Sequence, residues 1–209
     1  SSEMKEPTAG TVRALEHIAG YLVHTPGMRL AGKRSSARDQ YVTYADSDHH
    51  GDPGVSTHSH TGVTVLLNGT PVFWRSNKQK FAVALSPAEA EIYALSEGAR
   101  DAQDVAWVLE EMGCELEWPL VVKTDSDQAL SFQWDSVARS KLRGCIDKRE
   151  KWVEELRDRD RVVAVSVDTK YNMADIHTKC LATSEFKRQR DWIMNSQLSR
   201  GMSILGEHL

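Results

Sequence analysis

The stretch that decides the fold is YVTYADSDHHGDPGVSTHSHTGVTVLLNGTPVFWRS, residues 41–76. Three runs in it are rich in β-branched and aromatic residues, which favours strands: 41–46, 61–69 and 70–76. The dipeptide Asn68-Gly69 is typical of a tight hairpin between the second and third runs. The stretch therefore predicts an antiparallel opening of three strands.

Beyond this opening, helices alternate with strands. Ser86 is suited to an N-cap, Pro87 to the first helical position and Glu89 to a capping box. We expect a long helix from here to about Met112, ended by Gly113. The other expected elements are a strand at 120–125, a short helix at 126–133, a charged amphipathic helix at 145–158 and a strand at 162–167. This order predicts an α/β fold with a mixed five-stranded sheet, three antiparallel strands and then parallel strands, flanked by helices.

The two ends of the chain stand apart from this pattern. Residues 11–25 have apolar side chains at helical spacing, and small polar residues follow at 31–39, as in a linker. The stretch FKRQRDWIMN, which begins at Phe186, predicts a docking helix rather than a nucleic-acid-binding arm. We therefore expect three parts: 1–38 with one separate amphipathic helix, a main domain at 39–181, and a helical tail at 182–209.

Composition sets limits on the class of protein. The chain has 209 residues and a net charge of −4, which argues weakly against a protein that simply coats nucleic acid. No apolar run approaches the roughly 18 residues of a membrane span, so we expect no membrane partner. Three well-separated cysteines predict free thiols in a reducing compartment. The first residues, SSEMKEPTAG, do not open with Met and show no secretion signal, so we expect a piece of a longer product.

Carboxylates stand where these elements begin or end. Hydrolysis of a phosphodiester with two metal ions about 4 Å apart needs several carboxylates, because hard divalent ions prefer oxygen ligands. Asp46 ends the first strand, and Asp125 ends the strand at 120–125. If these strands are neighbours in the sheet, both acids open onto one rim. Asp175 begins an expected last helix in YNMADIHTK, whose first turn would hold the acid and expose it.

The long helix offers two more acids, and its apolar stripe chooses between them. The stripe consists of Ala88, Ile92, Leu95, Ala99 and Ala106. Glu91 falls roughly 60° from the centre of this stripe, whereas Glu89 falls roughly 100° away on the other side. Glu89 also has the capping role, so Glu91 is the candidate for chemistry. Each acid alone is also typical of a plain turn or helix cap, and only the joint order of the four favours a site.

Four stretches together resemble a known family. They are YADSDHHGDPGVSTHSHTG (44–62), SNKQKFAVALSPAEAEIYALSEGARDAQDVAWVLEEMG (76–113), VKTDSDQAL (122–130) and NMADIHTK (172–179). In order and spacing they resemble the ribonuclease H domain of copia-type retrotransposon Pol polyproteins. The preceding EPTAGTVRALEHIAGYLVHTPGMRL (6–30) resembles the segment that joins the reverse transcriptase to that domain.

The resemblance implies a ribonuclease H-like fold and a two-metal-ion phosphodiester hydrolase. The enzyme would cut the RNA strand of an RNA–DNA hybrid with two Mg²⁺ or Mn²⁺ ions. Asp46 would contact both ions, Glu91 and Asp125 the ion that activates water, and Asp175 the ion at the leaving 3′ oxygen. The implied partner is the reverse transcriptase portion of the same polyprotein, and the implied location is the cytoplasm, including virus-like particles, or the nucleus.

The sequence departs from the family at a few positions. His49 replaces a tryptophan, and Lys179-Cys180-Leu181 replaces a KPL motif. The loop before Asp175 lacks the histidine of cellular ribonucleases H, so we expect slower turnover; His177 would substitute only if the last helix started late. A catalytically silent nucleic-acid-binding or scaffolding remnant is therefore the second hypothesis, and a DNA-directed nuclease of the same fold is the third.

Basic residues at two places are candidates for nucleic-acid contacts. Arg75, Asn77 and Lys78 precede the long helix, and the backbone amides after Ser86 offer an anion site. Further along the chain, the candidates for nucleic-acid contacts are Arg139, Lys141 and Arg143. These three residues fit a solvated helix face equally well. A zinc site is also considered for a group of histidines that consists of His49, His50, His58 and His60.

Overall fold

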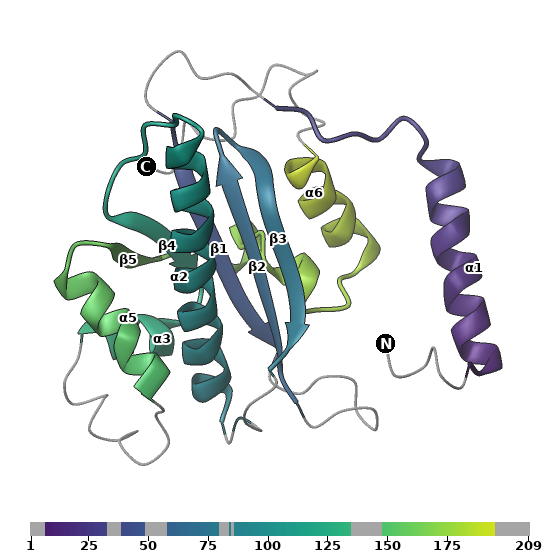
Figure 1. The fold of residues 1–209 in the computed structure, drawn as a ribbon. Helices are drawn as coiled ribbons and strands as arrows, with labels where there is room; N and C mark the ends of the chain where they lie inside the picture. The colour runs from purple at the N-terminus through teal and green to yellow at the C-terminus, as the bar shows by residue number, and fades with distance from the viewer. Residues whose placement is uncertain are drawn as a thin grey trace.

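The structure is a computed structural model that describes residues 7–32, 39–48, 58–79, 84, 86–134 and 148–194 (Figure 1). Its centre is one five-stranded sheet with the strand order β3-β2-β1-β4-β5. The strands are β1 (Tyr41–Asp48), β2 (His60–Leu67), β3 (Thr70–Lys78), β4 (Leu120–Thr124) and β5 (Val162–Ser166). Strands β1, β2 and β3 pair antiparallel, whereas β4 pairs parallel with β1 and with β5. The predicted mixed five-stranded sheet, with three antiparallel strands and then parallel strands, is confirmed.

The hairpin between β2 and β3 turns where the sequence predicted it. Asn68 and Gly69 have φ angles of 52° and 74°, and positive φ at both central residues is the requirement of the tight hairpin turn.

The first two strands are longer than predicted at one end. Asp48 still pairs with His60, so β1 runs two residues past Asp46.

In the described part of the chain, one face of the sheet is covered by α2 (Pro87–Glu111), α3 (Asp127–Trp134) and α5 (Lys148–Asp158) (Figure 1). Helix α2 begins as predicted, since the Ser86 hydroxyl accepts a hydrogen bond from the Glu89 amide at 3.2 Å. Its main core contacts are with β1, β2 and β4. A Cβ on Gly98 would come within 2.8 Å of the Ala45 Cβ. The missing side chain at Gly98 therefore lets α2 lie directly on β1.

The opposite face of the sheet carries a smaller apolar cluster. It contains Tyr44, Leu66, Met173 and Ala174, with Trp192 packed against it. Trp192 belongs to α6 (Thr183–Ile193), the helix predicted for the tail, and its ring stacks on Tyr171 at a centroid distance of 5.5 Å. The tail is therefore docked on the domain through residue 193.

Helix α1 (Ala9–His24) lies beside α6 and away from the sheet (Figure 1). The Tyr21 ring meets the Phe186 ring edge-on at 5.9 Å. The predicted helix is confirmed, and the apolar residues of α1 are exposed, for example Leu15 and Leu22 at 62% each. The division of the chain at 38 and 181 stays a prediction, because residues 33–38 and 195–209 lie outside the described residues.

Two further observations concern classes of protein considered above. Within the described residues, no helix combines the length and apolar character needed to cross a membrane. Cys114 and Cys180 are free thiols, as predicted, and Cys145 lies outside the described residues.

Candidate metal centre

Asp46 and Asp125 lie side by side on neighbouring strands. In the parallel pair of β1 and β4, Tyr44 is opposite Lys123, and each acid stands two residues further along its chain. The Asp46 side chain is 1% exposed, and Asp125 directly follows β4. The prediction that the two acids meet is confirmed, but the prediction that Asp46 ends its strand is wrong, because β1 stays paired with β2 as far as Asp48.

Asp175 joins them from a short 3-10 turn, η3 (Asp175–His177), and not from the α-helix that we expected. The expectation that Asp175 would be exposed is also wrong, since it is 5% exposed. The physical reason is close packing on β2, where a Cβ on Gly62 would lie 2.7 Å from the Ala174 carbonyl oxygen. The Ser76 hydroxyl holds the end of this turn by donating to the His177 carbonyl oxygen at 2.6 Å.

The three aspartates form one cluster. Asp46, Asp125 and Asp175 each offer a carboxylate oxygen, and these oxygens all lie within 4.8 Å of one another. Among the described residues, this is the group whose side chains are close enough to hold a metal ion. The predicted convergence from separate elements is therefore confirmed for these three acids.

Glu91 faces the same cluster from the first turns of α2. Burial raises the pKa of Glu91 to about 8, and the nearby charges of Asp46 and Asp125 act in the same direction. Among the described residues, its Oε2 is buried without a hydrogen-bond partner. Glu91 is therefore close enough to the aspartates to be affected by their charge, although it lies outside the group of three acids that could hold a metal ion, whereas the Glu89 backbone serves the helix cap. The catalytic role of Glu91 stays a prediction.

The crowded acids influence each other's protonation. Burial raises the pKa of Asp46 to about 7; Lys179 and Thr178 oppose this effect, and the charges of Asp175 and Asp125 add to it. Burial also raises the pKa of Asp175. Carboxylates that are buried this close together tend to bind protons, unless a nearby cation compensates their negative charge. An all-oxygen site of this charge fits Mg²⁺ or Mn²⁺, which prefer carboxylate ligands.

Comparisons with known proteins show the family of the chain. No protein-family model matches the chain. The retrovirus-related Pol polyprotein from transposon TNT 1-94 of Nicotiana tabacum is 31% identical over 144 residues, which cover 69% of this chain and 10% of that protein. The corresponding polyprotein from transposon RE1 of Arabidopsis thaliana is 30% identical over 190 residues, which cover 90% of this chain and 12% of that protein. The chain belongs to the copia-type retrotransposon Pol family. It spans about a tenth of the length of these two relatives.

The chain is also similar to two other proteins. A secreted RxLR effector protein of Plasmopara viticola, number 161, is 40% identical over 90 residues, which cover 43% of this chain and 61% of that protein. Among solved structures, LC11-RNase H1 in complex with an RNA/DNA hybrid has a TM-score of 0.45 and 15% identity, over 66% of this chain and 94% of that chain. Neither similarity bears on the activity of this Pol segment.

Three polar side chains that sequence reasoning missed surround the acids of the Pol segment. The Lys179 ammonium contacts Asp46 Oδ1 at 3.2 Å and Asp175 Oδ1 at 2.9 Å. The Thr178 hydroxyl donates to Asp46 Oδ2, and the Asn172 amide donates to Asp125 Oδ1 at 3.0 Å. The spacing of four residues between Asp175 and Lys179 was the one available signal in the sequence. Burial by itself would lower the pKa of Lys179, but Asp46 and Asp175 outweigh it, so the pKa is raised.

His177 does not lie in the metal centre of the Pol segment. Its Nε2 lies 2.9 Å from the Thr64 hydroxyl oxygen, in the packing between the 3-10 turn and β2. Burial lowers the pKa of His177 to about 4. The possibility that His177 replaces the missing histidine of cellular enzymes is therefore wrong, because the ring is held against β2.

Replacement of His177 by glutamine is expected to make the folded state less sensitive to acid. The pKa of about 4 lies below the ordinary 6.5, so between these values the unfolded chain binds a proton that the folded chain does not. The contribution of His177 to stability is thus present above pH 6.5 and is lost as the pH falls towards 4. From pH 7 to pH 5, the wild type should lose about 2 kcal/mol more free energy of unfolding than His177→Gln. Urea unfolding with EDTA at both pH values measures this difference, and equal losses would contradict it.

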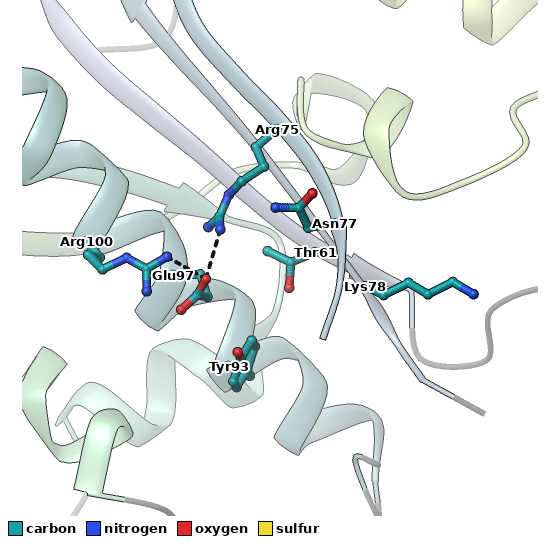
Figure 2. A pocket seen from close by; sticks show the side chains of 7 residues that line it. All are labelled: Thr61, Arg75, Asn77, Lys78, Tyr93, Glu97 and Arg100. Carbon is teal, nitrogen blue, oxygen red and sulfur yellow. Dashed lines mark hydrogen bonds and ion pairs between the residues drawn. The ribbon is translucent and has the colours of Figure 1, made fainter. Parts of the chain in front are cut away.

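The predicted nucleic-acid contacts fall into three groups. Arg75, Asn77 and Lys78 line a hollow between β3 and α2, together with Thr61, Tyr93, Glu97 and Arg100 (Figure 2). Arg75 is ion-paired with Glu97 at 2.9 Å and with Asp101 at 2.7 Å. Ser86 caps α2. The third group, Arg139, Lys141 and Arg143, lies outside the described residues. A nucleic-acid-binding role stays a prediction for all of them.

The histidine group is only partly described. His58 and His60 lie in the described part of the chain, and His49 and His50 do not. Neither described histidine belongs to the metal-capable group of the described residues, which is the aspartate cluster. The zinc hypothesis gains no support there.

Proposed function

We propose that this chain is a metal-dependent endonuclease that hydrolyses the RNA strand of RNA–DNA hybrids during reverse transcription of a retrotransposon. The observation that carries the proposal is the convergence of the aspartate cluster, with Glu91 facing it, from β1, α2, the end of β4 and η3. Three carboxylates within 4.8 Å of one another, with Glu91 close enough to be affected by their charge, are unfavourable for stability alone, because like charges repel when buried. They are the ligand set that two hard divalent ions require.

The residues present fit two Mg²⁺ or Mn²⁺ ions. All four acids are oxygen donors, and the buried Oε2 of Glu91 has no hydrogen-bond partner among the described residues. Bound ions would supply an activated water molecule and stabilise the negative charge on the leaving 3′ oxygen. We assign Asp46 to both ions, Glu91 and Asp125 to the ion on the side of the water, and Asp175 to the ion on the side of the leaving oxygen.

The hollow between β3 and α2 supports a nucleic-acid substrate. Lys78 and Arg100 line it, and their cationic groups are suited to backbone phosphates, although Arg100 is also paired with Glu97 at 2.8 Å. Asn77 adds an amide donor at the same place (Figure 2). We further propose that the chain works beside the reverse transcriptase portion of a longer Pol polyprotein, in the cytoplasm, in virus-like particles or in the nucleus. The share of its relatives that it spans, about a tenth, supports such a larger assembly.

One observation favours a second candidate, a silent segment that binds hybrids without cutting them. Lys179 contacts both Asp46 and Asp175 and neutralises part of their charge. A site whose acids were permanently satisfied in this way would have no use for divalent ions. The two candidates therefore differ in metal-dependent cleavage and not in binding.

The test is cleavage of end-labelled RNA–DNA hybrid, double-stranded RNA and double-stranded DNA, each with Mg²⁺, with Mn²⁺ and with EDTA. We expect the wild type to cut only the hybrid and only with metal, leaving a 5′ phosphate and a 3′ hydroxyl. Asp125→Asn should retain hybrid binding and lose cleavage, since the amide still contacts Asn172 but no longer carries charge. Metal-dependent cleavage of double-stranded DNA would overturn the substrate assignment. Hybrid binding without cleavage would favour the silent candidate.

A further inference from the structure

Lys179 connects two of the proposed metal ligands. Its Nζ lies 3.2 Å from Asp46 Oδ1 and 2.9 Å from Asp175 Oδ1, so one ammonium group bridges acids from β1 and η3. The acids are almost fully buried, at 1% and 6% exposed side chain, whereas Lys179 is 37% exposed. The charged end of Lys179 is thus inside the site, while part of its side chain is in solvent.

Among the described residues, the side-chain donors to the three aspartates come from one stretch of the chain. Asn172, Thr178 and Lys179 belong to the last stretch of the domain, and each donates to an aspartate oxygen. On the α2 side, Glu91 Oε2 has no hydrogen-bond partner among the described residues. The charge compensation in this site is therefore unequal: the Asp46 and Asp175 side has its own cation, and the Glu91 side has none.

We infer that Lys179 is a built-in counter-ion that holds Asp46 and Asp175 together before metal binds, and that it must withdraw when a divalent ion occupies the Asp46 and Asp175 side. This rests on the proposed function, because it takes these acids as metal ligands. The ammonium contacts one oxygen of each acid, and a metal ion on that side needs the same oxygens.

The side chain of Lys179 is suited to such a movement. An ammonium on a flexible four-carbon chain makes point contacts that are lost and remade without a fixed orientation. Its partial exposure leaves a path into solvent, and the next residue, Cys180, is exposed. Lys179 competes with the metal for these two oxygens, and only molecules with the lysine withdrawn are competent to bind. The observed metal affinity is therefore lower than it would be without the lysine. Lys179 is therefore a positioning residue that sets how much divalent ion the site requires.

The test is binding of Mn²⁺ alone to the whole chain at constant pH, measured by calorimetry and by electron paramagnetic resonance. Lys179→Met keeps the length of the side chain and removes the charge, so it should bind Mn²⁺ about tenfold more tightly than the wild type. Lys170→Met is the matched control, because Lys170 pairs with Asp168 at 3.5 Å on the surface, and its affinity should be unchanged. Lys179→Arg keeps the charge and should bind no more tightly than the wild type. Equal or weaker Mn²⁺ binding by Lys179→Met overturns the inference.

A second measurement uses only the wild type, so it does not depend on the folding of a variant. Mn²⁺ should increase acetylation of Lys179 by an amine-directed reagent severalfold, as read by mass spectrometry, and leave that of Lys170 unchanged. Protection or no change at Lys179 overturns the inference and leaves the nuclease proposal standing. If neither the wild type nor Lys179→Met binds Mn²⁺, both proposals fail. If Lys179 behaves as expected but no hybrid is cut, only the nuclease proposal fails.

Discussion

Asp46→Asn is expected to lower the rate of hybrid cleavage by roughly 10³-fold or more, equal to about 4 kcal/mol of lost transition-state stabilisation. Asp46 is the acid with the most neighbours in the site: Asp125 and Asp175 lie in its cluster, and Thr178 and Lys179 bond to its carboxylate. An asparagine has the same shape but no negative charge, so it cannot serve as a ligand shared by two ions. Single-turnover cleavage at saturating Mg²⁺ measures the loss.

The matched control is Glu89→Gln on the same helix as Glu91. Its backbone amide caps α2, and the substitution leaves that amide in place, so cleavage should stay near the wild-type rate. Thermal unfolding in EDTA should show that Asp46→Asn is folded. Because the metal-free site contains too many buried carboxylates, removal of one charge should not lower its melting temperature. Near-wild-type cleavage by Asp46→Asn, or an equal loss in Glu89→Gln, would contradict the assignment of the acids.

Gly62→Ala is expected to lower the free energy of unfolding by about 3 kcal/mol, which for a chain of this size lowers the melting temperature by roughly 6 to 12 °C. A Cβ at Gly62 would lie 2.7 Å from the Ala174 carbonyl oxygen, 2.8 Å from Thr178 Cγ2 and 2.9 Å from His177 Cβ. The Ala174 oxygen is a backbone atom, and the His177 Cβ is bonded directly to the backbone. Neither atom can move away unless the backbone moves with it. The turn must therefore lift from β2 and carry Asp175 away from Asp46.

Two measurements separate this effect from a general loss of helix or sheet. Gly20→Ala in α1 is the matched control, because nothing lies within 4 Å of a Cβ there, and its melting temperature should be unchanged or slightly higher. Gly62→Ala should also bind Mn²⁺ more weakly at temperatures where it is still folded. If it unfolds at the same temperature as the wild type, the close packing of the turn on β2 is not what holds Asp175 in place.

Much of the site was predictable from local patterns. Asp46 and Asp125 could be chosen because β-branched runs predict the strands, and neighbouring parallel strands bring corresponding positions together, although β1 continues two residues past Asp46. Glu91 could be separated from Glu89 because a helix rotates by about 100° per residue, so the apolar stripe defines which acid faces the sheet. These inferences work because strand and helix periodicities act over many residues.

The turn and the burial of Asp175 could not be predicted from such local patterns. Its turn, η3, has three residues, which is too short for a periodicity, and the position of Asp175 in the sequence suggested the start of an α-helix. Its burial depends on Gly62, a residue more than a hundred positions earlier in the chain. The same long-range packing directs His177 towards Thr64 and away from the acids.

The sequence by itself determined the order of the strands and helices, the hairpin at Asn68-Gly69 and the choice of the four acids, because each depends on local spacing along the chain. Only the tertiary structure decided how those acids are neutralised. The contacts of Lys179 and Thr178 with Asp46 join residues far apart in sequence, and they form only where the turn packs on the sheet. Such contacts leave no periodic pattern, because a single close approach of two backbones creates them.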